Sequence, residues 1–120
     1  MRAEWLIKGR VCKVIVPMEV TDDMLHAYDK EIISLMDEAP GKVNIIVDVG
    51  SMTAMPGVRT WLSLKNKHHP NFGMTLIVGL EHKPVIRFFA SVVSQTMSLP
   101  FKGFPSEENA LDYLREIKAI

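Results

Sequence analysis

The sequence has little of what several classes of protein require. It holds one cysteine, Cys12, which excludes an intrachain disulfide and favours a reducing compartment. Lysine plus arginine total 14, as do aspartate plus glutamate, so the chain lacks the basic surplus that nucleic-acid binding needs. No apolar run approaches the roughly 18 residues of a membrane span, and the N-terminus shows no signal peptide. We therefore expect a cytoplasmic protein with no nucleic-acid partner and no membrane span.

Motifs for catalysis, cofactors and metals are also lacking. The sequence has no P-loop, no dinucleotide-binding glycine motif and no Gly-x-Ser-x-Gly. Among the four histidines, the adjacent His68 and His69 would point about 100 degrees apart on a helix, which does not suit one metal. Cys12 lies within an apolar stretch with no base nearby in sequence, so it is interpreted as a small buried hydrophobe. We expect no enzyme activity, no cofactor and no metal.

What the sequence does have is enough apolar residues for one core. Hydrophobic residues make up 48% of its 120 residues, which suits a single domain over residues 1–120. Strands are predicted at 4–7 and 11–16, joined as a hairpin by the turn at Gly9, and at 42–49, 74–80 and 99–104. The strand at 11–16 is apolar in both of its alternating sets of residues. It is therefore expected to be covered on both faces.

Helices alternate with these strands. The first is predicted from its N-cap, Thr21, to about Ala39, with an apolar stripe from which Asp29 is excluded. Others are predicted at 58–67, with Trp61 facing inward, at 84–98, and after the cap residue Ser106. The order predicts an α/β fold with a mixed, mostly parallel sheet, an antiparallel edge hairpin, about five strands and four helices.

Four stretches resemble the SpoIIAA-like branch of the STAS domains, the family of anti-sigma-factor antagonists and sulphate-transporter cytoplasmic domains. They are residues 20–23 (Val-Thr-Asp-Asp), 44–48 (Asn-Ile-Ile-Val-Asp), 75–79 (Thr-Leu-Ile-Val-Gly) and 104–114, which opens with Phe-Pro-Ser-Glu-Glu. The resemblance covers about residues 5–117 and implies a non-catalytic regulatory domain that binds a protein partner, or a homodimer. Family members carry a phospho-acceptor serine in the loop after the third strand. Here residues 55–57 (Met-Pro-Gly) stand in that place, so the resemblance implies that this serine is lacking.

The same loop, residues 50–57, is the first candidate site. Ligands and partners of parallel α/β sheets usually meet the carboxyl ends of the strands. One interpretation is a glycine-rich connector in which Asp48 and Ser51 satisfy backbone amides. The other is a partner-contact loop formed by Asp48, Ser51, Thr53 and Gly57, in which the Ser51 or Thr53 hydroxyl is open to phosphorylation.

The predicted helix at 84–98 is the second candidate site, because its apolar residues, including Phe88 and Phe89, occupy more than one stripe. Its extra apolar side could cover the last helix, a second subunit or an apolar ligand. Because the SpoIIAA-like group resembles the Sec14-type lipid-binding domain, the alternative function is binding of an apolar small molecule or lipid, with Trp61 lining the pocket. The eight methionines are interpreted as core filler in preference to an adaptable binding surface.

Overall fold

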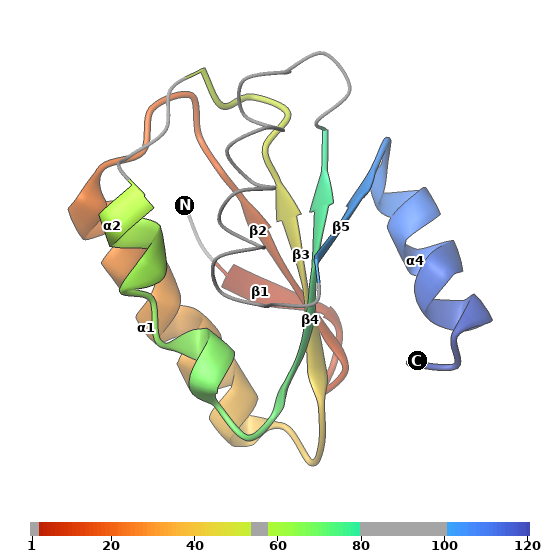
Figure 1. Ribbon diagram of the computed structural model, residues 1–120. Helices are drawn as coiled ribbons and strands as arrows, with labels where there is room; N and C mark the ends of the chain where they lie inside the picture. The colour runs from red at the N-terminus through yellow and green to blue at the C-terminus, as the bar shows by residue number, and fades with distance from the viewer. Residues whose placement is uncertain (1–2, 54–57, 80–100) are drawn as a thin grey trace.

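The computed structural model describes residues 3–53, 58–79 and 101–120, and it has the α/β architecture that the sequence predicts (Figure 1). Its sheet has the order β1-β2-β3-β4-β5. The strands are β1 (Ala3–Ile7), β2 (Val11–Ile15), β3 (Val43–Asp48), β4 (Phe72–Val78) and β5 (Phe101–Phe104). Strand β1 is antiparallel to β2 and the other neighbours are parallel, which confirms the predicted edge hairpin.

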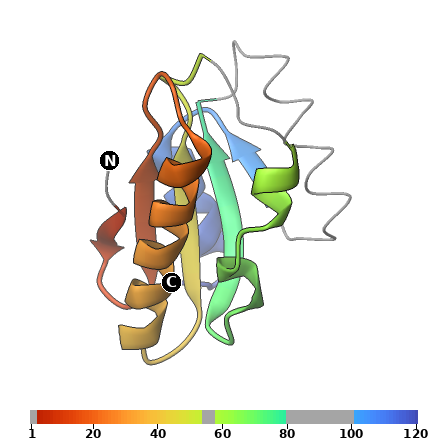
Figure 2. The same cartoon turned by 90° about the vertical axis from the view of Figure 1, so that its left-hand side faces the viewer.

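Helices cover both faces of this sheet (Figures 1 and 2). Helix α1 (Asp22–Glu38) and the short α2 (Val58–Leu62) lie on one face, and α4 (Glu107–Glu116) lies on the other. A 3-10 turn, η1 (Asn66–His68), precedes β4. The described residues thus hold three of the four expected α-helices. The predicted helix at 84–98 lies outside them, as do Gly57, Phe88 and Phe89.

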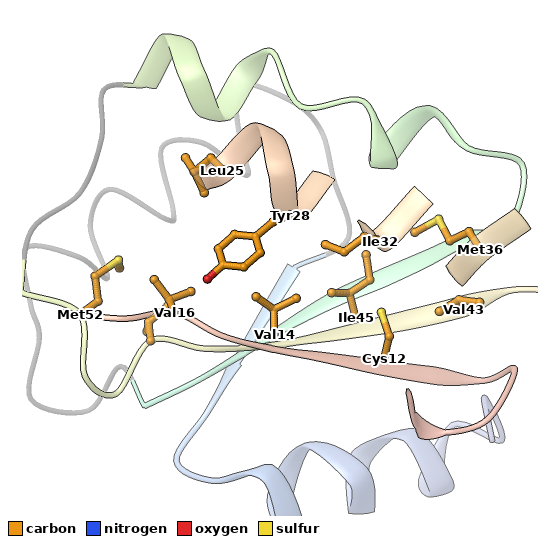
Figure 3. Close-up of a cluster of buried hydrophobic side chains, with 11 residues drawn as sticks. Cys12, Val14, Val16, Leu25, Tyr28, Ile32, Met36, Val43, Ile45 and Met52 are labelled. Atoms are coloured by element: carbon orange, nitrogen blue, oxygen red, sulfur yellow. The ribbon is translucent and has the colours of Figure 1, made fainter. Parts of the chain in front are cut away.

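The first core forms between α1 and the sheet (Figure 3). Helix α1 begins where predicted, because the Thr21 hydroxyl accepts a hydrogen bond from the Met24 N–H at 3.2 Å. Apolar side chains three or four residues apart then face the sheet. The buried members contributed by α1, by β2 and by the residue after β2 are Leu25, Tyr28, Ile32, Met36, Cys12, Val14 and Val16. Cys12 is fully buried, as its interpretation as a small hydrophobe requires.

The second core forms between α4 and the opposite face of the sheet. The Ser106 hydroxyl caps α4 by accepting from the Asn109 N–H at 3.2 Å. Ala110 and Leu114 then pack over Ile46 and Leu76. Beside this core, the Lys13 ammonium on β2 pairs with the Glu107 carboxylate at the start of α4.

Strand β2 is not covered on both faces along its whole length, which corrects the sequence prediction. Val11, Lys13 and Ile15 alternate onto the α4 side, since Val11 joins the α4 core and Lys13 contacts Glu107. Helix α4 packs on β3, β4 and β5. The last residue of β2, Ile15, therefore keeps 52% of its surface exposed.

The helix predicted at 58–67 is also shorter than expected, and the cause is Asp29. This side chain was excluded from the apolar stripe of α1, yet it is only 5% exposed. Its carboxylate accepts the backbone N–H groups of Lys65 at 2.7 Å and Asn66 at 2.9 Å, and also the Asn66 side-chain amide. Those amides cannot continue the hydrogen bonds of α2, so the chain leaves the helix after Leu62 and forms η1.

Further side-chain hydrogen bonds hold the loops at the amino ends of the parallel strands. The Asn71 amide donates to the Met36 and Ala39 carbonyls, which closes the C-terminus of α1. His69 accepts the Asn71 N–H at Nδ1, so its Nε2 carries the proton that it shares with Asp37 at 2.7 Å. Here the hydrogen bonds serve to join α1, η1 and β4.

Candidate functional site

The candidate site lies at the carboxyl ends of the parallel strands, where the loops after β2 and β3 meet. Asp48 ends β3, and its Oδ1 accepts the Gly50 N–H at 2.9 Å. Gly79, which follows β4, has a positive φ of +89°, and a Cβ built on it would lie 2.8 Å from the Gly50 nitrogen. Glycine is required at Gly79, because the two loops pass each other backbone against backbone.

Two contacts hold the loop at 48–53 firmly against the sheet. Met52 is fully buried and packs in the α1 core beside Val16 (Figure 3), which supports its interpretation as core filler. Thr53 donates both its backbone N–H and its hydroxyl to the Met18 carbonyl, at 2.9 and 3.0 Å. The loop after β3 is thereby tied to the loop after β2.

Ser51 lies between Gly50, whose N–H is bonded by Asp48, and the buried Met52, and it is exposed. Its hydroxyl has no hydrogen-bond partner among the described residues, whereas the Thr53 hydroxyl is engaged by Met18. One interpretation of this loop is a connector in which Asp48 and Ser51 satisfy backbone amides. Asp48 does so, because it accepts a hydrogen bond from the Gly50 N–H, but Ser51 does not. Ser51 is presented to solvent by a loop whose backbone is held on both sides.

Two apolar side chains are exposed beside this loop. Met18 is 61% exposed, and Ile15 is 52% exposed. Ile15 is the register partner of Asp48 on the neighbouring strand, so their side chains share one face of the sheet. We call Ile15, Met18 and the loop residues Asp48–Thr53 the contact surface. The sequence predicts the loop of the contact surface but not its exposed apolar side chains, because Ile15 belongs to a strand that is predicted to be buried on both faces.

In the part of the chain that the structure describes, acidic side chains lie at the same end of the sheet as the contact surface. Glu19, Asp22 and Asp23 follow Met18 and are exposed, and the last two occupy the first turn of α1. Glu107 and Glu108 occupy the first turn of α4. Since both helices run antiparallel to the parallel strands, both helix N-termini lie at this end of the sheet (Figure 1).

The remaining described candidate is Trp61. It packs against the α1 core together with Leu64, and that core also contains Met52 of the loop. In the same core, Tyr28 is 5% exposed and its hydroxyl has no hydrogen-bond partner among the described residues. Burial, with the nearby charge of Glu31, raises the pKa of Tyr28 to about 12. The structure therefore places Trp61 over the interior on the α1 side.

The described residues hold one thiol and several carboxylates and imidazoles. Burial raises the pKa of the Cys12 thiol to about 12, which removes its nucleophilic thiolate at neutral pH. Within residues 3–53, 58–79 and 101–120, no group of three or more His, Cys, Asp or Glu side chains is arranged to hold a metal ion. No helix in these ranges has the length and apolarity needed to cross a membrane.

Comparison with models of known protein families found no match, and comparison with curated proteins found none either.

Proposed function

We propose that this chain is a non-catalytic regulatory domain that binds a protein partner, in the manner of the anti-sigma-factor antagonists that its sequence resembles. The proposal includes the SpoIIAA-like STAS fold with a fourth helix at 84–98 and a cytoplasmic location. A second copy of the chain is one of the partners it allows. The contact surface is the proposed place of binding.

The observation that carries the proposal is the pair of exposed apolar side chains beside a loop that is held in place. Full burial of a side chain of this size contributes roughly 1.5–3 kcal/mol. Ile15 and Met18 are about half exposed, so a partner that covers them gains about 1 kcal/mol from each. Binding costs little conformational entropy in this loop, because Met52 and Thr53 already hold it in place.

Ser51 is the residue at which modification would regulate such binding. A phosphate on its exposed hydroxyl would add nearly two negative charges beside Asp48 and break no hydrogen bond among the described residues. Phosphorylation of Thr53 would instead break the bond between its hydroxyl and Met18. We therefore favour Ser51 over Thr53 as the phosphorylation site.

Photo-crosslinking in cells tests the proposal. A photoreactive amino acid replaces Ser51 in one variant and the exposed Glu38, at the other end of the sheet, in the control variant. We expect the Ser51 position to give an adduct of discrete mass with one protein, or with a second copy of this chain, and the Glu38 position to give none. Absence of an adduct at Ser51, or the same adduct from both positions, would refute the proposal.

The captured partner then allows the apolar contact to be measured. Met18→Asp should weaken its binding at least about tenfold, because about 1 kcal/mol of burial is lost and a charge must be desolvated. The matched control is Ile117→Asp, which changes an apolar residue that is also exposed but lies after α4. Equal losses from the two variants would place the binding site elsewhere.

The second candidate function is binding of an apolar small molecule or lipid, and one observation favours it. A buried hydroxyl with no partner costs about 1–3 kcal/mol, and the Tyr28 hydroxyl lacks a partner among the described residues. A polar group of a ligand between α1 and the sheet would satisfy it. Native mass spectrometry of the purified chain would detect such a ligand, and a spectrum with only the mass of the chain would rule the function out.

A further inference from the structure

Charge is segregated between the two ends of the sheet, although the net charge is zero. At the carboxyl ends of the parallel strands, acidic side chains outnumber basic ones in the described residues. These acidic residues, which we call the acidic rim, are Glu19, Asp22, Asp23, Asp48, Glu107 and Glu108. At the opposite end, basic side chains follow β1, precede β3, lie in or before η1 and end α4, and they outnumber the acidic ones there, Asp37, Glu38 and Glu116, in the described residues. These basic residues are Lys8, Arg10, Lys42, Lys65, Lys67, Arg115 and Lys118.

Helix dipoles do not neutralise the acidic rim. The N-terminus of a helix is equivalent to about half a positive charge, whereas α1 and α4 each carry two carboxylates in the first turn. Each helix start therefore keeps a net charge of about −1.5. The Lys13 ammonium offsets one of these carboxylates, that of Glu107, and Arg59 is exposed on α2. Among the described residues around Ile15 and Met18 the balance stays negative.

We infer that the partner of the contact surface presents lysine or arginine side chains around an apolar contact. This inference rests on the proposed function and specifies the chemistry of its partner. Ile15 and Met18 supply the apolar contact, and the acidic rim favours a partner with basic side chains around its own apolar contact. A partner with acidic groups in that position would be repelled, so the charges give specificity and speed association more than they add affinity.

A second copy of the chain does not satisfy this chemistry in a two-fold symmetric dimer. Most of its described basic residues lie toward the opposite end of the sheet, so the contact surface of one copy would have to meet the amino end of the next. Such a head-to-tail contact is heterologous and extends into a ring or an open filament. We therefore assign the surface to a different, basic protein and treat head-to-tail assembly as a result that would overturn the assignment.

Three amphipathic helical peptides that share one leucine face test the inference. Their polar faces carry lysine, glutamine or glutamate. Binding to the full chain is followed by fluorescence anisotropy, and the site is located by amide chemical-shift mapping. We expect the lysine peptide to bind at least about threefold more tightly than the glutamine peptide, and the glutamate peptide most weakly. The shifts should map to residues 15–23 and 48–53.

Changes in salt concentration and charge substitutions distinguish the effect of the acidic rim from the effect of the net charge of the chain. Raising NaCl from about 0.05 M to about 0.5 M should weaken the lysine peptide at least about threefold, because it shortens the screening length severalfold. The variant Glu19→Gln, Asp22→Asn, Asp23→Asn should lose most of the lysine preference. Its control, Glu38→Gln, Asp112→Asn, Glu116→Gln, changes the net charge equally at other positions and should keep that preference.

The outcomes distinguish this inference from the proposed function. Equal binding of the three peptides at the contact surface would overturn the basic partner and leave a protein-binding site in place. Binding of every peptide elsewhere, or of none, would count against both. Concentration-dependent filaments of the chain alone, abolished by the triple variant at 19–23 or by Lys42→Gln, would assign the acidic rim to self-assembly instead. If the triple variant at 19–23 does not fold, the salt dependence of the unchanged chain decides the question.

Discussion

The two ends of the sheet are built differently. At the amino ends of the parallel strands, side chains such as Asp29 and Asn71 bond the backbone of neighbouring segments. At the carboxyl ends, the loop after β3 is held by a buried methionine and by the bonds from Thr53 to Met18, while Ser51, Ile15 and Met18 face solvent. Polar groups at the first end are used for internal bonds. At the second end, polar and apolar groups remain available to a partner.

This contrast separates stability from binding. Residues that satisfy internal amides should affect unfolding strongly when changed, and the solvent-facing residues of the contact surface, Ile15, Met18 and Ser51, should affect it little. Stability measurements test this difference without knowledge of the partner.

Among the residues that make internal hydrogen bonds, the largest effect is expected for Asp29→Ala. Its carboxylate accepts three hydrogen bonds from η1 and the segment before it, and each buried donor left without a partner costs about 1–3 kcal/mol. We expect the free energy of unfolding to fall by about 3 kcal/mol or more, measured by urea denaturation. Asp29→Asn, which keeps one acceptor oxygen, should cost less. Equal and small losses for both variants would show that Asp29 does not hold this end together.

Gly79→Ala should follow, with a loss of about 2 kcal/mol. The residue has a φ of +89°, and a Cβ would lie 2.8 Å from the Gly50 nitrogen and Cα, so strain and a backbone clash add. The matched control is Gly41→Ala at the other end, where nothing lies within 4 Å of the added Cβ. Thermal unfolding midpoints of the two variants provide the test, and the prediction fails if they agree.

Alkaline pH should weaken the α1 core through Cys12. Its pKa is raised from 9.0 to about 12 in the folded chain, so the unfolded chain ionises first. The resulting stability is fully present below pH 9 and is lost as the pH rises toward 12, by up to about 1.4 kcal/mol per pH unit. Urea unfolding at pH 8 to 10 should show a steeper decline than in Cys12→Ala. Identical slopes, or rapid alkylation of the folded thiol at pH 8, would contradict the buried state.

The smallest effect is expected for Met18→Ala. Surface substitutions usually change stability by less than about 0.5 kcal/mol, and Met18 is 61% exposed. Met52→Ala, in the neighbouring loop, should cost about 2–5 kcal/mol because Met52 is fully buried. If the Met18 variant lost as much stability as the Met52 variant in calorimetry, Met18 would belong to the core and not to the contact surface.

The features that could be predicted from the sequence are those set by local periodicity and capping. The start of α1 at Thr21, the edge hairpin and the parallel β3 follow from nearby residues. The break after α2 could not be predicted, because it depends on the carboxylate of Asp29, which is more than 30 positions away in sequence. The exposure of Ile15 was missed for a similar reason. It depends on which strands α4 packs against, and the apolar pattern of β2 does not determine that.

The candidate site was predicted in part. The rule that parallel sheets present loops at their carboxyl ends pointed to residues 48–53, and the structure adds the hydrogen bonds that hold them. Met18 gave no signal, since an exposed methionine and a buried one look alike in sequence. The roles predicted for Gly57, Phe88 and Phe89 remain predictions, because these residues lie outside the described ranges.

Hydrogen–deuterium exchange of the chain, alone and in complex with the partner captured through Ser51, distinguishes a carboxyl end that binds from an amino end that stabilises. If the carboxyl end binds and the amino end stabilises, peptides covering residues 15–23 and 48–53 will gain protection, while those covering 37–44 and 64–72 will exchange as before. Protection confined to the amino end of the sheet would contradict the account.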